Sequence, residues 1–320
     1  MSSVRIVSPE YNLLDGSKRP LVQRVGDGSI ITRFEKTPLP TKPTDVVCPH
    51  FLELKWATGC PFDCAWCYLN GTLRFAPKKA QPYVKDYGKI EQHVRAFLEN
   101  VDWCEELLNT GELADSLMWE RNGKPFSKFI LSLFHSQNGH KVLFVTKSDN
   151  IENLLGGDHR GNAIISFSLN ADTVARRFEK RAPPVAERIE AASKLSSAGY
   201  EVRLRIDPIV PVLNWEEGYK SLIDQIFSKF IPARITLGSL RGLQSTINQA
   251  PDKSWVKYLS EKSSWGKRIE FNTRYWIYYK LIRYLQEKYF YTNIALCKET
   301  LEMWDKLGMD YRKIKCNCTL

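Results

Sequence analysis

The sequence lacks long apolar stretches. No part of the 320-residue chain approaches the roughly twenty apolar residues of a membrane-spanning helix, so we expect no membrane partner. The first residues, Met1 to Arg5, do not form the apolar segment of a secretory signal, and we therefore expect a cytoplasmic protein. Because a reducing compartment disfavours disulfides, the eight cysteines are expected to serve as thiols or metal ligands.

The composition permits one large core and a charged partner. Apolar residues make up 43% of the chain, enough for a barrel or another α/β domain. The formal net charge of +10 is compatible with binding to DNA or RNA, although plain solubility explains it as well. Fifteen Phe, fourteen Tyr and nine Trp are available to stack on bases, but we expect most of these rings in the core.

Three cysteines close together in the chain are the most informative feature. Cys60, Cys64 and Cys67 have the spacing Cys-x3-Cys-x2-Cys and follow the apolar stretch 51–57. A cubane iron–sulfur cluster takes one thiolate per iron, so three ligands leave one iron open to a substrate or cofactor. A zinc knuckle or three buried thiols are alternatives, but the third close cysteine and its place after a strand favour the cluster.

Beyond residue 47, short apolar runs alternate with amphipathic helices, which is typical of parallel βαβ units. The expected strands are 51–57, 105–110, 141–146, 163–169, 201–207 and 233–238. The expected helices are 86–99, 125–137, 149–155, 184–198 and 215–229. Six such units are consistent with an α/β fold, a partial (β/α)6 TIM-type barrel with an N-terminal arm and a C-terminal helical extension.

We divide the chain into three parts. Residues 1–47 are rich in Pro, Lys, Arg and Thr and are expected to form an irregular arm. Residues 48–245 would form the partial barrel, and residues 246–320 a C-terminal extension with a cysteine-rich tail. In such barrels the chemistry lies at the carboxyl ends of the strands, where this sequence places several polar residues. These are Glu112, Lys147, Ser168, Asn170 and Arg241.

The spacing of the three cysteines and the Trp66-Cys67 pair resemble the radical SAM superfamily. The resemblance implies that Cys60, Cys64 and Cys67 hold a [4Fe-4S] cluster whose open iron binds S-adenosylmethionine (SAM). It further implies that reductive cleavage of SAM yields a 5′-deoxyadenosyl radical, with electrons from a reductant such as flavodoxin or ferredoxin.

A closer resemblance, over about residues 51–240, is to the spore photoproduct lyase family. The matching segments are 145–147, 167–172, 188–192, 198–200, 208–210 and 215–219. The resemblance implies a lyase or isomerase that abstracts hydrogen from a thymine-derived base in DNA, and so repairs a lesion or modifies the base. Two alternatives remain open: a radical SAM enzyme acting on a peptide, a free nucleoside or RNA, and a non-catalytic, metal-stabilised nucleic-acid-binding protein.

The same resemblance assigns cofactor contacts. Tyr68 would lie beside SAM, and Glu112 would accept hydrogen bonds from its amino group. Lys147 would meet the SAM carboxylate, while Ser168 and Asn170 would contact its methionine or ribose moieties. A carboxylate for an ammonium and a lysine for a carboxylate form a coherent set. Alternatively, Glu112 is a turn cap, Lys147 a solvated loop residue, and Ser168 and Asn170 satisfy backbone groups.

The chain departs from the family at one position. Spore photoproduct lyases carry a hydrogen-donor cysteine at the end of the second strand, where this sequence reads Thr110, Gly111 and Glu112. Cys104 lies in the same unit but at the wrong end of the strand. Either another residue quenches the substrate radical, or the reaction needs no such donor, as in an isomerase or a lyase that returns hydrogen from 5′-deoxyadenosine. The resemblance therefore does not establish reversal of a thymine dimer.

The tail adds three cysteines. Cys297, Cys316 and Cys318, joined by Cys48 if the tail folds back, could hold a second iron–sulfur cluster or a zinc ion. Alternatively, Cys316 or Cys318 donates a hydrogen atom to a radical, or these are thiols on a flexible end.

A helix is expected before the tail. Arg274, Lys280 and Arg283 on it could follow phosphates beside a flipped-out base. An amphipathic helix that closes the barrel explains most of the same residues.

Overall fold

A ten-stranded sheet organises the computed structural model, which describes residues 4–75, 81–137 and 139–320. Its strand order is β1-β4-β5-β7-β10-β11-β12-β13-β14-β18, and the last seven of these run parallel to one another. The parallel strands are β7 (Phe51–Leu54), β10 (Leu107–Asn109), β11 (Lys141–Thr146), β12 (Ala163–Leu169), β13 (Glu201–Ile209), β14 (Arg234–Ser239) and β18 (Ile294–Leu296). This confirms the expected α/β class and partial barrel, with all six expected strands present.

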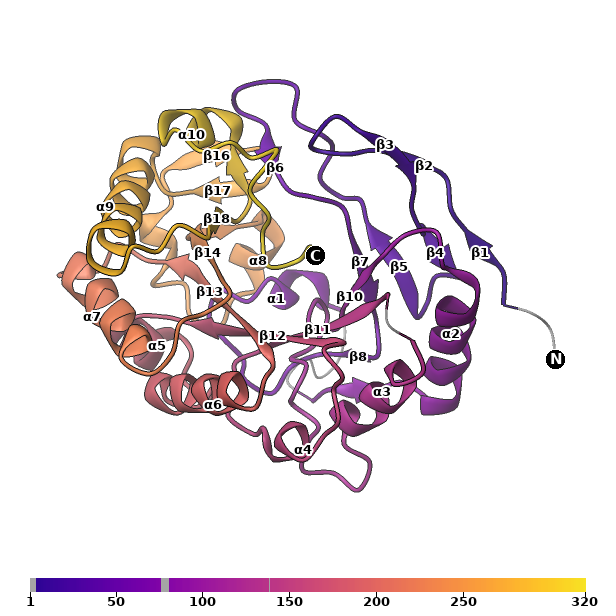
Figure 1. Cartoon of the computed structure of the whole chain (residues 1–320). Coiled ribbons are helices and arrows are strands. Elements are labelled where there is room, and N and C mark those ends of the chain that lie inside the picture. The colour runs from indigo at the N-terminus through magenta and orange to yellow at the C-terminus, as the bar shows by residue number, and fades with distance from the viewer. Residues whose placement is uncertain (1–3, 76–80, 138) are drawn as a thin grey trace.

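Helices cover the outer side of the curved sheet (Figure 1). Those connecting the parallel strands are α2 (Tyr87–Asn100), α3 (Phe126–Phe134), α4 (Glu152–Leu155), α5 (Asp172–Phe178), α6 (Val185–Ser197) and α7 (Trp215–Phe227). Every expected helix is present, and α5 is one that the sequence analysis missed. The side chain of Asp86 accepts a hydrogen bond from the Lys89 amide and so fixes the start of α2. Strand β12 is buried along its whole length, as a central parallel strand requires.

The expectation of an irregular N-terminal arm is wrong. The strands of this region are β1 (Ile6–Val7), β2 (Glu10–Asn12), β3 (Lys18–Pro20), β4 (Arg24–Val25), β5 (Ile31–Phe34) and β6 (Val46–Val47). Strand β5 pairs antiparallel with β7, and β4 and β1 continue the sheet beyond it. An edge strand exposes unpaired backbone N–H and C=O groups, so covering the edge of β7 explains why this proline-rich segment becomes ordered.

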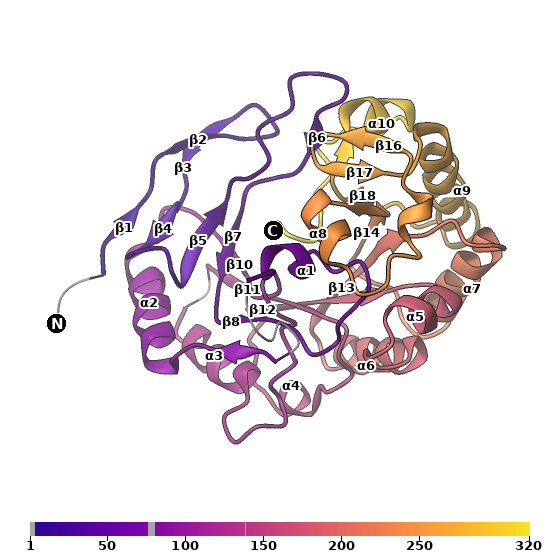
Figure 2. The ribbon, with the colours of Figure 1, turned by 180° about the vertical axis from the view of Figure 1, so that it is seen from behind.

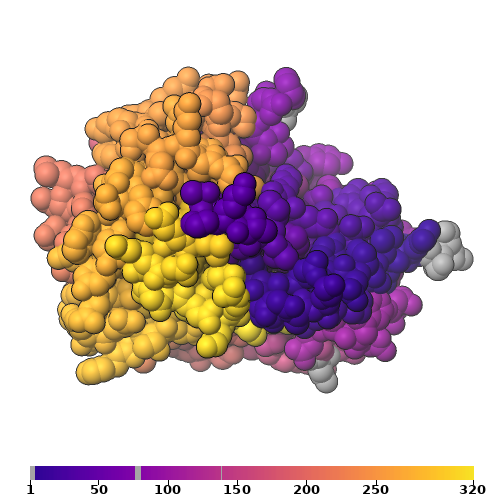
Figure 3. All heavy atoms as spheres, turned by 90° about the horizontal axis from the view of Figure 1, so that it is seen from above, coloured from indigo at the N-terminus to yellow at the C-terminus, as the bar shows by residue number. Residues whose placement is uncertain are grey.

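The C-terminal part contributes more than a helical extension. Strand β18 is a seventh parallel strand that joins β14, and α9 (Phe271–Tyr289) packs against α7. The smaller elements are α8 (Gln244–Gln249), β15 (Arg241–Gly242), β16 (Glu261–Ser263), β17 (Gly266–Arg268), β19 (Glu299–Thr300) and α10 (Leu301–Lys306). Strand β19 pairs with β6, which ties the arm to this part of the chain. The two parts abut on one face of the molecule (Figure 3).

The cysteine-rich tail lies inside the curve of the sheet, so the alternative of a flexible end is wrong. The C-terminus lies near the centre of the ring of strands in both ribbon views (Figures 1 and 2). Asn317 is fully buried, and its side-chain nitrogen donates to Ser166 Oγ at 2.9 Å and to the Leu204 carbonyl at 2.9 Å. Its side-chain oxygen accepts from Thr236 Oγ1 at 2.8 Å. Three strands, β12, β13 and β14, therefore anchor the tail.

The phosphate-tracking role considered for Arg274 is wrong. This guanidinium is fully buried and forms ion pairs with Glu299 and, at 3.0 Å, with Glu261. Lys280 and Arg283 are exposed on the same helix. No helix within residues 4–75, 81–137 and 139–320 has the length and apolar character needed to cross a bilayer.

Candidate functional site

The three clustered cysteines occupy the loop between β8 (Ala57–Thr58) and α1 (Leu69–Thr72). Gly59 enters the loop at φ +95°, a conformation that favours glycine. The loop is held by hydrogen bonds from the Gly59 amide to the Leu113 carbonyl, 2.8 Å, and from the Ala65 amide to the Phe178 carbonyl, 2.9 Å. Contacts to two distant segments thus fix the cysteine loop beside the carboxyl ends of the strands.

The surroundings of this loop disfavour the thiolate form of its cysteines. Burial raises the pKa of Cys60 and of Cys64, and the negative charges that neighbouring thiolates would carry raise both further. Lys147 opposes the shift at Cys64 but is outweighed. Metal binding removes the free-energy cost of forming the thiolates, because the positive centre stabilises them directly. The donor set therefore fits an iron–sulfur cluster.

The spacing of the side chains also bears on the kind of centre. Among the described residues, no three His, Cys, Asp or Glu side chains lie close enough to ligate one metal ion. A cubane cluster places each thiolate on a different iron, so its three ligands need not converge on a single point. The second metal site proposed for Cys297, Cys316 and Cys318 is likewise not formed as a single-ion site within the described ranges, and stays a prediction.

Glu112 follows β10 at the carboxyl edge of the sheet. Its side chain accepts from Asn109 Nδ2 at 3.4 Å and from the Tyr68 hydroxyl at 3.5 Å. Gly111 precedes it because a Cβ at that position would lie 2.4 Å from Cβ of Val145. The structure thus brings Tyr68 and Glu112 together beside the cysteine loop, while their contacts to SAM stay predictions.

Lys147 belongs to a buried charged group rather than to a solvated loop. Its Nζ lies 3.6 Å from Glu179 Oε1, and Glu179 Oε2 accepts from Arg188 at 2.6 Å. Burial alone would lower the pKa of Lys147, but the charges of Glu179 and Cys64 outweigh it and leave the pKa raised. Lys147 therefore remains a cation next to the cysteine loop.

Glu179 and Arg188 are site neighbours that the sequence analysis did not assign. Arg188 Nη1 also donates to the Ser168 carbonyl at 3.2 Å, which links this charged group to the end of β12. The Arg188-Ile189-Glu190 match to the family was the available signal, but it did not show that the arginine points inward.

Ser168 and Asn170 differ in what they leave available. Ser168 is buried at the end of β12. The Asn170 amide donates to the Pro208 carbonyl at 2.8 Å and accepts from the Tyr219 hydroxyl at 2.6 Å. The Asn170 side chain is thus engaged within the fold, which favours the structural alternative for this residue. A SAM contact stays a prediction for both.

Glu53 is a further carboxyl group that the sequence analysis missed. It lies on β7, in register with Asn109 of β10, and is buried. Burial, together with the charge of Glu112, raises its pKa to about 7. A single charged residue within the apolar run Phe51–Leu54 was the signal for a functional or structural exception.

Arginines and thiols lie together beside β13 and β14. Arg241 donates to both carboxylate oxygens of Asp207, at 3.0 and 2.8 Å, and to Cys297 Sγ at 3.4 Å. Arg205, two residues before Asp207 on β13, donates from Nη2 to Cys318 Sγ at 3.0 Å. The structure therefore brings the tail cysteines to the inner face of β13, at the strand where polar ends were expected.

A family model described as spore photoproduct lyase matches residues 50–309. The chain belongs to the spore photoproduct lyase family. Members of this radical SAM family are lyases that bind SAM and a [4Fe-4S] cluster. The matched range includes the cysteine loop, Glu112, Lys147 and all seven parallel strands.

Among curated proteins, the spore photoproduct lyase of Bacillus subtilis is 31% identical over 193 residues, 54% of this chain and 50% of that protein. The spore photoproduct lyase of Geobacillus is 28% identical over 173 residues, 53% and 49% of the two chains. The chain thus spans about half the length of the curated relatives it matches.

Solved structures agree on the fold. A spore photoproduct lyase complexed with dinucleoside spore photoproduct aligns with TM-score 0.64 at 18% identity, covering 77% of this chain and 75% of that one. A variant with bound AdoMet and dinucleoside spore photoproduct aligns with TM-score 0.65 at 19% identity, covering 82% and 79%.

Proposed function

We propose that this chain is a radical SAM enzyme that acts on a thymine-derived base in DNA. Cys60, Cys64 and Cys67 would hold the [4Fe-4S] cluster. Bound there, the cluster and SAM supply a carbon-centred radical that abstracts hydrogen from the substrate. The observation that carries the proposal is the thiol trio beside the carboxyl ends of parallel strands, with Cys64 buried and Cys60 and Cys67 half-buried, in a chain of the spore photoproduct lyase family.

The chain's own residues would bind and orient the cofactor. Glu112 offers a carboxylate to an ammonium group, and the hydroxyl of Tyr68 keeps that carboxylate in place. Lys147 offers a cation to a carboxylate, while Glu179 and Arg188 fix its position from below. The buried walls around these groups would exclude water from a reactive carbon radical.

The substrate class is supported by the relatives and by charge. The curated relatives are named spore photoproduct lyases, and a net charge of +10 suits a polyanionic substrate. Thr110, Gly111 and Glu112 stand where the family carries its hydrogen-donor cysteine, and the Thr110 hydroxyl donates to the Leu143 carbonyl and lies 2.7 Å from Ser116 Oγ. The outcome of the reaction is therefore either repair of a lesion or rearrangement of the base.

Anaerobic reconstitution tests this function. The protein is expected to bind iron and sulfide, to absorb broadly in the visible range, and to lose that absorption on reduction. With a low-potential one-electron donor of the flavodoxin or ferredoxin class, it should cleave SAM to 5′-deoxyadenosine. Dinucleoside spore photoproduct should stimulate this cleavage more than an unmodified dinucleotide, RNA or a peptide.

Two lysine variants test the assignment of Lys147 to the SAM carboxylate. Lys147→Met should raise the KM for SAM with little change in iron content, because the predicted carboxylate partner is removed. Lys124→Met, at an exposed lysine outside the site, should leave the KM unchanged. A protein that binds only zinc, or that leaves SAM intact under reducing conditions, would contradict the proposed function. Stimulation by RNA or a peptide alone would contradict the DNA substrate.

A further inference from the structure

The tail that enters the barrel carries two thiols whose positions are fixed by the strands. Arg203 donates to the carbonyls of Asn317, at 2.9 Å, and Thr319. Arg234 donates to the Cys316 carbonyl at 2.6 Å. Together with the buried side chain of Asn317, these bonds hold the backbone on both sides of Cys318. A thiol held in this way has a defined direction.

The Cys318 thiol contacts a strand that neighbours predicted cofactor contacts. Its partner Arg205 is in register with Ser168 on β12, the residue expected to contact SAM. The charge of Glu112 also acts on Cys318. Nε of Arg205 is buried and has no hydrogen-bond partner among the described residues, which leaves a donor free for a ligand atom on the same inner surface. Cys318 thus lies beside a strand whose neighbour carries a predicted cofactor contact.

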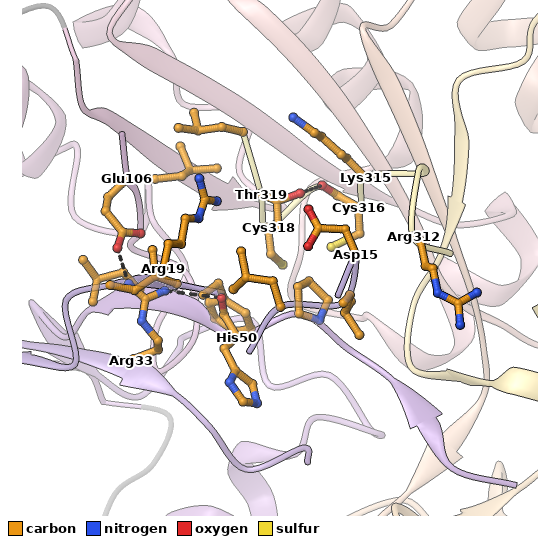
Figure 4. Close-up of a pocket in the computed structure, with 18 of the residues that line it drawn as sticks. Asp15, Arg19, Arg33, His50, Glu106, Arg312, Lys315, Cys316, Cys318 and Thr319 are labelled. Atoms are coloured by element: carbon orange, nitrogen blue, oxygen red, sulfur yellow. Dashed lines mark hydrogen bonds and ion pairs between the residues drawn. The ribbon is translucent and has the colours of Figure 1, made fainter. Parts of the chain in front are cut away.

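Cys318 also lines a cavity. This cavity of about 560 Å³ lies between the N-terminal arm, the tail and the start of β10, and Cys104 lines it as well. Figure 4 shows Cys316 and Cys318 on one wall of it, with Arg33 and His50 on another. A thiol bordered by a cavity has room to change rotamer, unlike one locked in a packed core.

The two tail thiols differ in their protonation. The hydrogen bond between them lowers the pKa of Cys316 and raises the pKa of Cys318, and burial raises that of Cys318 further. Cys318 therefore keeps its hydrogen at neutral pH, and Cys316 is the acceptor. Only a thiol, not a thiolate, has a hydrogen atom to transfer.

Other thiols fit this role less well. Cys104 lines the same cavity, but it contacts Glu106 at the opposite end of β10 from Glu112, at an S···O distance of 4.0 Å. Cys297 follows β18 and interacts with Arg241 and Asp207 at the rim.

We propose that Cys318 donates the hydrogen atom that quenches the substrate radical, with Arg205 as its positioning residue. The proposal rests on the radical SAM function proposed above and places the donor on the tail, whereas Thr110, Gly111 and Glu112 follow the second parallel strand. The S–H bond of Cys318 breaks and a C–H bond forms on the substrate, leaving a thiyl radical on Sγ. One electron from the low-potential donor and one proton from solvent restore the thiol.

Deuterium from solvent reports on the donor, because thiol hydrogens exchange with water and carbon-bound hydrogens do not. Reconstituted enzyme in D2O, given dinucleoside spore photoproduct, should place deuterium in the repaired product. Cys318→Ala and Cys318→Ser should lose this label while still forming 5′-deoxyadenosine. Cys316→Ala should keep the label, as should the control Cys104→Ala. Product without deuterium from the unaltered protein, or a full label from Cys318→Ala, overturns the proposal.

A second outcome separates this proposal from the function it rests on. If the enzyme cleaves SAM but leaves the dinucleoside unchanged, lesion repair is contradicted. The 5′-deoxyadenosine formed without substrate is then analysed for solvent deuterium. Loss of that deuterium in Cys318→Ala supports the donor, and equal deuterium in both proteins overturns it. Failure of the enzyme to cleave SAM would contradict both proposals.

The protonation of the two thiols can be measured without the cluster. In metal-free protein, alkylation by iodoacetamide followed by peptide mapping should modify Cys316 at lower pH than Cys318. Cys316→Ala should shift the profile of Cys318 towards lower pH, because the thiolate neighbour is gone. Alkylation of Cys318 ahead of Cys316 at neutral pH would show a thiolate at Cys318 and overturn the proposal.

Discussion

Two groups of cysteines face the interior of this protein, and they are built in opposite ways. Cys60, Cys64 and Cys67 come from one short loop whose spacing alone brings them together. The second group, which we call the tail thiol group, consists of Cys48, Cys297, Cys316 and Cys318, drawn from three distant segments. The tail thiols are close enough to perturb one another's charge, and Arg205 and Arg241 contact two of them.

The difference lies in the charge that surrounds each group. Lys147 and Arg188 offset the charge of a thiolate at Cys64 only in part, so a metal centre would stabilise the thiolates of the loop. The tail thiol group already has two arginines, and Cys318 stays protonated. The first group is therefore suited to ligation and the second to hydrogen or proton transfer.

The largest expected effect separates the two groups outright. Replacing Cys60, Cys64 and Cys67 together by alanine should abolish iron binding and SAM cleavage in a folded protein, because all three ligands are removed. Replacing Cys297, Cys316 and Cys318 together should leave the iron and sulfide content of one cluster. Metal analysis and circular dichroism measure both. Loss of all iron from the second triple variant would contradict the division between the groups.

A large loss of stability is expected beside the loop cysteines. Glu179 compensates the buried Arg188 at 2.6 Å, so Glu179→Ala leaves that charge unpaired and should lower the free energy of unfolding by about 3–5 kcal/mol. The pair between Glu190 and Lys229 is solvent-exposed, and Glu190→Ala should cost at most about 1 kcal/mol. Urea denaturation measures both variants, and equal losses would refute the importance of burial here.

The sequence predicted the first group outright, whereas it suggested the second only on the condition that the tail folds back. Strand β12 was located to the residue because its apolar run is bounded by turns, and the loop thiols follow from spacing alone. Asn317 carries no local signal, since its partners Ser166 and Thr236 lie more than 80 residues away in the chain. Arg188 and Glu179 are only nine residues apart, but the sequence does not show that the end of α5 and the inner face of α6 bury this pair.

We expect Glu53 to make the free energy of unfolding depend on pH. Burial and the charge of Glu112 raise its pKa from 4.5 to about 7, while Lys55, Lys36 and Lys298 oppose the shift. The folded state therefore binds the proton more tightly than the unfolded state. This stabilisation is complete below pH 4.5 and is lost as the pH rises to about 7, at most about 3 kcal/mol.

Glu53→Gln tests this expectation because glutamine stays neutral at every pH. In metal-free protein, its free energy of unfolding should lack the decline that the unaltered protein shows between those two pH values. Glu105→Gln, at an exposed carboxylate, should keep the decline. Parallel profiles for Glu53→Gln and the unaltered protein would contradict a raised pKa.

The anchor of the tail should have a smaller effect. Asn317→Ala leaves Thr236 and Ser166 without their buried partner and should lower the free energy of unfolding by about 1–3 kcal/mol. It should also speed alkylation of Cys318 in metal-free protein, because the backbone beside that thiol is released. Asn122→Ala, at an exposed position, should change neither quantity. Unchanged alkylation in Asn317→Ala would mean that the arginine contacts alone hold the tail.

The smallest effect is expected at Lys298, which borders the tail thiol group. Its ammonium lies 3.6 Å from the centroid of the Trp265 ring and 4.5 Å from that of Phe34, so Lys298→Gln should cost about 0.5–1 kcal/mol. Burial raises the pKa of Cys48 and Lys298 partly offsets this, so the variant should also slow alkylation of Cys48. Lys36→Gln, whose ammonium lies 6.0 Å from the Phe34 ring, is the matched control for the ring contact. If both variants slow Cys48 alkylation equally, a diffuse positive charge, rather than the placement of Lys298, governs this thiol.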